Sequence, residues 1–416
     1  MKTDEIQVQP FDCMNYFYHA VQEQFIRQLT RFDGHLDVSA LKRAVDLSIR
    51  AVPLLSCCFN TKAHRWQERN FTADDIVHIV EVQSREENSC EQLLLSAIDF
   101  SREPQLKIFL VKEPDCDTLC VIINHMVCDG AGFKDYLYLL SDFYSNYKRN
   151  AADSDISPQK ADRSLRQLLR NLSRKEKLEI LCSKSDTPKL DASLILPLEG
   201  GNGQPFLALR RIEPQSFRKL KGYAKNNHVS LNDVLLTAYM RALHHITGRE
   251  RITVPCPVDL RKYALPNQEC GICHLTGNYI CKALVRDGDG FADTLKQVST
   301  QTRAQKNSKG CLKGPMLLHL LYPILPFRAV RKLFTVPVTS YTNLGVLQPE
   351  SFHFEGLAVC DAFFATAVKH APYFQVSVST YDDCCTLTSS SRSSLEDQKV
   401  IENLLDYMQT ELISLC

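Results

Sequence analysis

Three residues, His125, Asp129 and Gly130, are spaced so that they could act together in one site. His125 follows an apolar run that predicts a buried strand, and a strand end holds a side chain rigidly at a cleft. A histidine placed there could accept a proton near neutral pH, as a general base does. Gly130 would let a substrate approach the backbone, while Asp129 could orient the loop or pair with an arginine. The spacing also fits a loop histidine whose aspartate caps the next helix, so local chemistry leaves both interpretations open.

A second group of candidate ligands, Cys270, Cys273 and His274, has the spacing C-x-x-C-H. Covalent haem attachment uses this pattern in exported proteins, and the N-terminal residues lack the apolar stretch of a secretion signal. A zinc site would need two further ligands, and no second C-x-x-C of the zinc-ribbon type is present. We therefore expect no metal here. Cys128, inside the histidine loop, is interpreted as a small buried apolar side chain.

The residues on either side of the candidate histidine predict the elements that would position it. Residues 106–112 and 118–124 are apolar runs joined by a short loop, which predicts a hairpin. Beyond Gly132, apolar residues recur at helical spacing and predict a helix with one buried face. Ser230 and Ser394 are each followed by an aspartate at the position that completes a capping box, which predicts two further helix starts. Strands and helices mix throughout, so the expected class is α/β or α+β with two domains.

Composition limits the range of functions. The 416 residues are 44% hydrophobic and 23% charged, values typical of a globular chain. The net charge of +1 gives no overall attraction to nucleic acid or to anionic membrane. No run of about 18 uncharged apolar residues predicts a membrane span. The 17 cysteines, without a secretion signal, indicate reduced thiols, and we expect a cytoplasmic monomer that binds no nucleic acid.

The loop from Asn124 to Gly130 reads N-H-M-V-C-D-G and resembles the His-His-x-x-x-Asp-Gly motif of the condensation-domain-like superfamily. This superfamily includes the condensation domains of nonribosomal peptide synthetases, alcohol acetyltransferases, polyketide-associated acyltransferases and, more distantly, chloramphenicol acetyltransferase. The first motif histidine is Asn124 here, although asparagine can still hydrogen-bond a neighbouring backbone group. Further matching elements follow in the family's order: Pro257-Val-Asp-Leu-Arg261, Gly277-Asn278 and Thr342-Asn343-Leu344-Gly345.

The resemblance implies two chloramphenicol-acetyltransferase-like lobes, each a mixed sheet with flanking helices, and an active-site tunnel between them. We assign residues 1–150 to the N-terminal lobe with the His-x-x-x-Asp-Gly loop, 151–185 to a linker and basic helix, and 186–416 to the C-terminal lobe. The basic helix could be a solvated face, or a docking patch for a phosphate-bearing donor or an acidic carrier protein. The apolar stretch at 316–327 could be core, a tunnel wall for an acyl chain or a shallow membrane contact.

The resemblance also implies an acyltransferase in secondary or lipid metabolism. His125 would accept a proton from a hydroxyl or amine as that group attacks an acyl thioester, although a positioning role for this histidine stays open. Asp129 would pair with Arg261 of the other lobe, and Gly130 would keep the tunnel open. Two further candidates, Ser340 and Asn343, could donate to the developing oxyanion or simply form a turn at a strand end.

The expected donor is an acyl thioester, used as a substrate by a protein with no bound cofactor. It would be acyl-CoA or the phosphopantetheine arm of an acyl carrier protein, with a small-molecule acceptor. The sequence shows neither an adenylation nor a carrier domain, which favours a stand-alone enzyme with acyl-CoA slightly ahead. The alternative is a non-catalytic relative that binds or scaffolds a partner. The departure at Asn124 allows that alternative, whereas the presence of His125, Asp129 and Arg261 argues against it.

Overall fold

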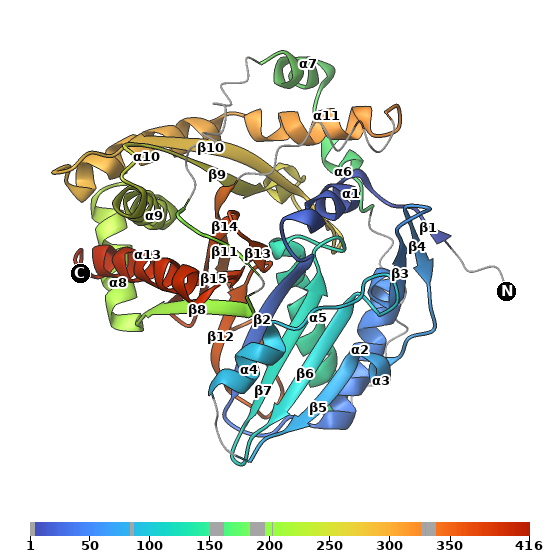
Figure 1. Cartoon of the computed structure of the whole chain (residues 1–416). Coiled ribbons are helices and arrows are strands. Elements are labelled where there is room, and N and C mark those ends of the chain that lie inside the picture. The colour runs from blue at the N-terminus through green and yellow to red at the C-terminus, as the bar shows by residue number, and fades with distance from the viewer. Residues whose placement is uncertain are drawn as a thin grey trace.

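Two lobes, each a mixed sheet with flanking helices, make up the protein (Figure 1). The computed structural model describes residues 5–83, 87–149, 162–183, 196–201, 203–325, 329 and 338–416. Each lobe has its own large hydrophobic core. The predicted class and the two-lobe organisation are therefore confirmed. Most of the predicted linker, residues 151–161, lies outside the described residues.

The first sheet contains the strand that leads to His125. Its strands lie in the order β12, β2, β7, β6 and β5, and all pairs are antiparallel except β5 with β6. The β6–β7 pair confirms the predicted hairpin. β12 belongs to the range 186–416, so the later part of the chain completes the sheet of the first lobe. The bounds are β2 (Phe25–Phe32), β5 (Val77–Glu81), β6 (Leu106–Lys112), β7 (Asp117–Asn124) and β12 (Val359–Ala365).

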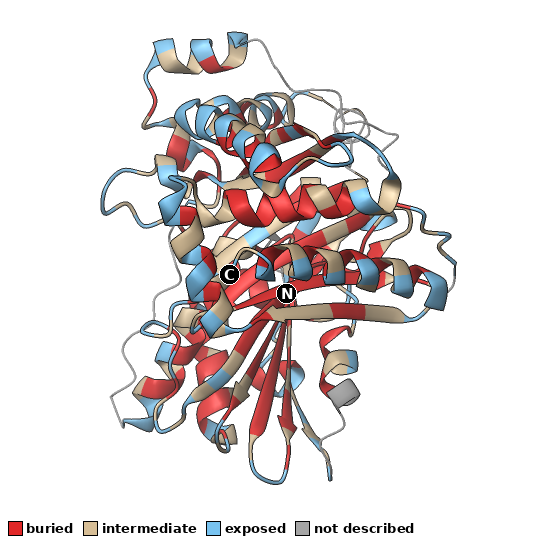
Figure 2. Cartoon of the chain, turned by 90° about the vertical axis from the view of Figure 1, so that its left-hand side faces the viewer, coloured by how far each residue is buried: buried red, intermediate tan, exposed pale blue. Residues whose placement is uncertain are grey.

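Helices cover both faces of this sheet. α2 (Val38–Ala51) and α5 (Gly130–Lys148) pack on one face, and α4 (Glu87–Leu94) lies on the other (Figure 1). A strand covered on both faces must be apolar on both faces, which is why β7 is one continuous apolar run. Figure 2 shows the buried residues following the strands of this sheet and the inner faces of the helices.

The first lobe also contains smaller elements. They include a three-stranded sheet in the order β1, β4, β3, and the N-terminal helix α1. These elements are β1 (Glu5–Ile6), α1 (Pro10–Phe17), η1 (Tyr18–Ala20), η2 (Pro53–Ser56), β3 (Cys57–Asn60), β4 (Arg65–Glu68) and α3 (Ala73–Ile76).

The second sheet has the order β11, β14, β15, β13, with β8 also paired to β15. α8, α9 and α13 pack into its core. Both predicted capping boxes are confirmed, at Ser230 with Asp233 and at Ser394 with Asp397. The bounds are β8 (Pro205–Ile212), α8 (Pro214–Asn226), α9 (Leu231–Thr247), β11 (Thr339–Val346), β13 (Lys369–His370), β14 (Phe374–Tyr381), β15 (Cys384–Arg392) and α13 (Leu395–Ile413).

β9 and β10 form a long antiparallel pair, and α10 and α11 lie beside it (Figure 1). The expected basic helix is split in two, because Ser173 and Glu176 form a capping box that starts α7. None of the helices in the described ranges has the length and apolar character needed to cross a membrane. The bounds are α6 (Arg166–Leu169), α7 (Arg174–Cys182), β9 (Arg251–Asp259), η3 (Leu260–Tyr263), β10 (Thr276–Leu284), α10 (Phe291–Asn307), η4 (Gly310–Leu312) and α11 (Lys313–Leu321).

Candidate active site

The turn after β7 is held by Asn124, the residue that departs from the family motif. Its side chain is fully buried, donates to Oε1 of Gln105 at 2.6 Å and accepts from the backbone N–H of Met126 at 2.9 Å. The backbone N–H of His125 donates to the carbonyl of Gln24 at 2.7 Å. Asn124 therefore fixes the turn that presents His125, as an asparagine with both amide atoms bonded can do.

The ring of His125 is oriented by the backbone of its own loop. Nδ1 lies 2.8 Å from the carbonyl oxygen of Cys128. Because a carbonyl only accepts, Nδ1 carries the hydrogen and Nε2 keeps its lone pair. Burial lowers the pKa of His125, although the bond to Cys128 and the carboxylate of Asp129 oppose that shift. His125 is therefore neutral near pH 7, the protonation state that a general base requires.

Asp129 joins the two parts of the site. It caps α5 by accepting from the N–H of Gly132 at 2.9 Å, and Nη1 of Arg261 lies 3.0 and 3.1 Å from its two oxygens. It also accepts from the N–H of Leu275 at 2.7 Å and the hydroxyl of Thr276 at 2.9 Å. Burial opposes ionisation, but the guanidinium of Arg261 and the hydrogen bond from Gly132 hold the pKa of the carboxyl well below its usual range. The expected pairing of Asp129 with Arg261 is present, and Asp129 caps the helix as well.

His274 also belongs to the site, although the sequence did not predict this. In the sequence it stood out only as part of the C-x-x-C-H pattern, for which no metal was expected. Its ring stacks on His125 with centroids 5.3 Å apart, and Phe11 stacks on its other side at 5.1 Å. Burial lowers the pKa of His274 to about 3, so the ring is neutral. Its Nδ1 is buried without a partner among the described residues. A usable signal was present, since His274 lies between Arg261 and Gly277-Asn278, two of the matched family elements.

Two glycines of the histidine loop lie where a side chain would collide. A Cβ at Gly130 would overlap the side chain of Leu344. A Cβ at Gly132 would lie 2.9 Å from the carbonyl oxygen of Cys273 and from Cβ of Cys128, closer than such contacts normally are. Gly132 therefore lets the first turn of α5 pack directly against the segment that carries His274.

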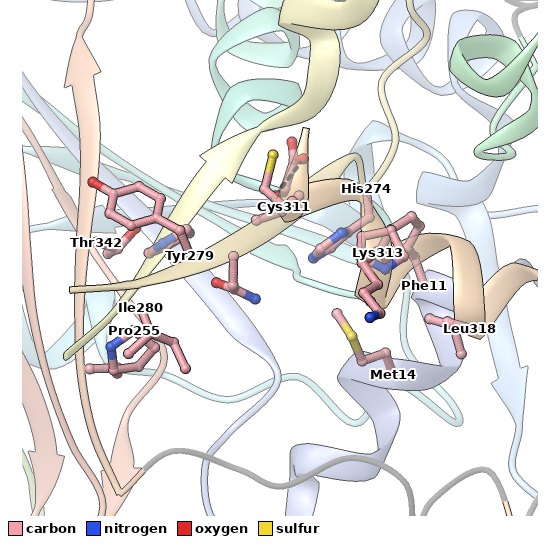
Figure 3. A pocket seen from close by; sticks show the side chains of 18 of the residues that line it. Phe11, Met14, Pro255, His274, Tyr279, Ile280, Cys311, Lys313, Leu318 and Thr342 are labelled. Carbon is pink, nitrogen blue, oxygen red and sulfur yellow. Dashed lines mark hydrogen bonds between the residues drawn. The ribbon is translucent and has the colours of Figure 1, made fainter. Parts of the chain in front are cut away.

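A cavity of about 1210 Å³ opens beside His125 and is lined by both lobes. Figure 3 shows its walls: Phe11 and Met14 of α1, Lys313 and Leu318 of α11, and Pro255 and Tyr279 of the β9–β10 hairpin surround one hollow. The volume exceeds that of a typical small-ligand pocket, about 300–1000 Å³. The polar residues of the lining include Gln22, His125, Asp129, His274, Ser340, Thr366 and Lys369.

The two oxyanion candidates are placed differently. Ser340 lines the cavity, and its hydroxyl donates to the carbonyl of Phe374 at 3.3 Å. Asn343 is not among the lining residues; its amide donates to Asn232 at 2.9 Å and its oxygen accepts from Gly345 at 2.8 Å. These bonds hold a strand-end turn. Only Ser340 is therefore in contact with the space where a substrate would react.

Cys128 and the two cysteines of the C-x-x-C-H pattern, Cys270 and Cys273, take part in packing. Burial raises the pKa of the Cys128 thiol well above its usual range, so it stays protonated and is a poor nucleophile. The carbonyl of Cys273 accepts from Nη2 of Arg261 at 2.8 Å. In the ranges that the structure describes, no three His, Cys, Asp or Glu side chains gather as metal ligands would.

Comparison with known proteins places these residues in a recognised fold. No protein-family model matches the chain. The chain is 24% identical over 310 residues to cyclosporin synthetase from Tolypocladium inflatum, a match that covers 67% of this chain and 2% of that protein. The chain therefore spans a very small part of that relative's length.

Solved structures match over nearly the whole chain. Polyketide synthase associated protein 5 from Mycobacterium tuberculosis has a TM-score of 0.71 at 16% identity, covering 99% of this chain and 97% of that one. The first condensation domain of the CDA synthetase has a TM-score of 0.71 at 12% identity, with the same coverage. The trichothecene 15-O-acetyltransferase from Fusarium sporotrichioides has a TM-score of 0.69 at 12% identity, covering 96% and 94%. The chain thus has the same fold as this polyketide-associated protein, this condensation domain and this acetyltransferase.

Proposed function

We propose that this protein is an acyltransferase that moves an acyl group from a thioester to a hydroxyl or amine, with His125 as the general base. The observation that carries the proposal is the hydrogen bond from Nδ1 of His125 to Cys128, which leaves an unprotonated Nε2 in a cavity lined by both lobes. The fold supports acyl transfer in general, because a solved acetyltransferase shares it. The reaction and its residues are our assignment.

The proposed step needs no further co-reactant. Nε2 of His125 takes the proton of the acceptor as the acceptor oxygen or nitrogen bonds to the thioester carbonyl carbon. The carbonyl electrons move to oxygen and return as the carbon–sulfur bond breaks. The imidazolium then gives its proton to the departing thiolate, so the products are an ester or amide and a free thiol. We assign Ser340 as a donor to the transient oxyanion, a role in which its hydroxyl would turn away from Phe374.

The donor would approach beside α7, which borders the cavity. Glu176 and Ile180 of α7 line the cavity, as does Lys309, which pairs with Glu176. Arg174 and Lys175 are exposed on the same helix, whereas Arg163, expected on this basic face, pairs with Asp12 at 2.9 Å. A phosphate-bearing arm, from CoA or from a carrier protein, would contact the cations of this rim, which lie beside the acidic Glu176 and Glu179.

The proposal is tested by incubating the purified protein with acyl-CoAs from acetyl to palmitoyl and with pooled alcohols and amines. Free CoA and acylated products are measured by mass spectrometry, since the cysteines of the chain would react with a thiol dye. We expect acyl transfer that falls about 100- to 10,000-fold in His125→Ala, because the base is lost. His353→Ala, which changes an exposed histidine outside the cavity lining, should keep the wild-type rate.

A third variant separates a base from a positioning residue. His125→Asn can keep an N–H directed at Cys128 but has no basic nitrogen. Inactivity equal to that of His125→Ala supports the base, whereas near wild-type transfer by His125→Asn would assign His125 a positioning role. If the wild type transfers no acyl group from any acyl-CoA but does so from an acylated carrier protein, the carrier protein is the donor. If the wild type transfers no acyl group from either donor, the proposed enzymatic function is wrong and a binding or scaffold role is favoured.

A further inference from the structure

A buried lysine lines the cavity close to His125. Lys369 in β13 exposes only 9% of its surface and lines the same cavity. Its strand lies against the segment after η1, where Gln22 bridges to Lys369 and the N–H of Glu23 donates to the carbonyl of Val368 at 2.9 Å. Lys369 is near enough to His125 to add to the lowering of that residue's pKa, after burial as the main cause. Lys369 and His125 therefore line the same cavity.

No carboxylate of the described residues forms an ion pair with Lys369. Its only hydrogen-bond acceptor among them is the neutral side-chain oxygen of Gln22. Glu23, the acid beside Gln22, is occupied by Arg27 at 2.6 Å and Arg392 at 3.3 Å. Successive side chains of an extended segment point to opposite sides, so Glu23 and Gln22 diverge. Burial lowers the pKa of Lys369 to about 7, as expected for an ammonium without a counter-ion.

A second buried donor, the hydroxyl of Thr366, lines the same cavity. Thr366 exposes 5% of its surface, and its hydroxyl is buried with no hydrogen-bond partner among the described residues. The amide nitrogen of Gln22 is a third possible donor on the lining. A buried cation without a counter-ion and a buried hydroxyl without a hydrogen-bond partner are both costly, and an anionic oxygen would satisfy both.

We propose that Lys369, Gln22 and Thr366 bind a carboxylate carried by the substrate, beside the base His125. This inference rests on the proposed function, because the carboxylate is taken to belong to a substrate of acyl transfer. The binding test itself does not require the protein to catalyse that reaction. A carboxylate fits better than a phosphate, because one ammonium with two neutral donors matches a single negative charge. The carboxylate can belong to the acceptor, as in a hydroxy or amino acid, or to a dicarboxylic acyl group.

The first test measures binding with a matched pair of apolar probes, octanoate and octanamide, by isothermal titration calorimetry. We expect the wild type to bind octanoate at least about tenfold more tightly, and Lys369→Met to lose that preference. Thr366→Val, which replaces the hydroxyl with a methyl group of similar size, should weaken octanoate binding less. Lys313→Met is the matched control, since Lys313 lines the same cavity from α11 and its loss should leave the preference intact.

Folding of the variants is followed by thermal unfolding. Lys369→Met should unfold at the same temperature as the wild type or higher, because an apolar side chain of similar length replaces an unpaired buried charge. If Lys369→Met did not fold, Thr366→Val and Gln22→Met would still test the site through octanoate binding. Equal binding of octanoate and octanamide by the wild type would overturn the proposal, as would a preference lost in Lys313→Met but kept in Lys369→Met.

A second comparison identifies which substrate carries the carboxylate. Succinyl-CoA is compared with butyryl-CoA, and a hydroxy acid with its amide, for binding to the wild type and Lys369→Met. A Lys369-dependent preference within the first pair places the carboxylate on the acyl group, and one within the second pair places it on the acceptor. No such preference in either pair contradicts the inference. Failure of acyl transfer alone, with Lys369-dependent octanoate binding preserved, would refute the proposed function and leave the carboxylate site standing.

Discussion

Asp129 shows how a single carboxylate organises the site at the scale of one residue. It exposes 3% of its surface and receives hydrogen bonds from two backbone amides, a hydroxyl and a guanidinium. The two amides come from Gly132 and Leu275, on opposite sides of the contact between the first lobe and the β9–β10 segment. A buried charge is tolerated only when it is paired and hydrogen-bonded, so Arg261 completes this arrangement.

Removing the cation should therefore be costly. In Arg261→Met, Asp129 keeps its neutral donors but loses its counter-ion, and we expect the free energy of unfolding to fall by roughly 3–5 kcal/mol. Urea denaturation measures the change. Asp74→Ala is the control, because its pair with Lys42 is a surface pair, with Asp74 78% exposed, and should contribute at most about 1 kcal/mol. Equal effects of the two variants would contradict the role given to the Asp129–Arg261 pair.

At the scale of elements, the segment between η3 and β10 is as important as the histidine loop. It supplies the carbonyl of Cys273 and the N–H of Leu275 to the Asp129–Arg261 pair, and it carries His274. Thr276, the first residue of β10, adds its hydroxyl. The first turn of α5 packs directly against it at Gly132. The position of His125 therefore depends on a helix start from one lobe and a loop from the other.

A methyl group at Gly132 should separate these two elements. In Gly132→Ala, the new Cβ would collide with the carbonyl of Cys273, which is backbone and cannot rotate away. We expect a loss of about 1–3 kcal/mol in unfolding free energy together with reduced acyl transfer. Gly222→Ala in α8 is the control, because nothing lies within 4 Å of its added Cβ, and alanine should raise helix stability by up to about 1 kcal/mol. Unchanged stability and transfer in Gly132→Ala would show that the contact is not tight.

At the scale of the whole molecule, two lobes with separate cores enclose a cavity lined by two neutral histidines, His125 and His274. Burial lowers the pKa of both His125 and His274, and that of His274 falls to about 3. An unfolded histidine binds a proton below about pH 6.5. Between these two values the unfolded chain binds the proton and the folded chain does not. Stability must therefore fall as the pH falls from about 6.5 towards 3.

Replacing His274 should weaken this acid sensitivity. His274→Gln is neutral at every pH, so the drop in unfolding free energy between about pH 7 and about pH 5 should be smaller than in the wild type. Chemical denaturation at a series of pH values measures the drop. His353→Gln, a change at an exposed position, should leave it unchanged. If the unfolding free energy of His274→Gln depended on pH as strongly as that of the wild type, His274 would take up a proton while the protein stays folded.

Local features of the chain could be predicted because they depend on neighbouring residues. The β6–β7 hairpin follows from two apolar runs and a polar loop, and the helix starts at Ser230 and Ser394 follow from side chains that bond their own backbone. His125 at the end of β7 was found in the same way. Its pairing partner Arg261 came from the resemblance to a known family, since 132 residues separate it from Asp129.

Only the tertiary structure decided which distant residues share the cavity. The bond between Leu275 and Asp129 spans 146 residues, and the contact between Gln22 and Lys369 spans 347. His274 was masked by a familiar cysteine pattern, and Lys369 is a single charge within a largely apolar run. Contacts of this kind arise from the packing of whole lobes, and no short-range periodicity records them. The sequence therefore determined the histidine and its loop, whereas the packing of the two lobes determined the surroundings that set its chemistry.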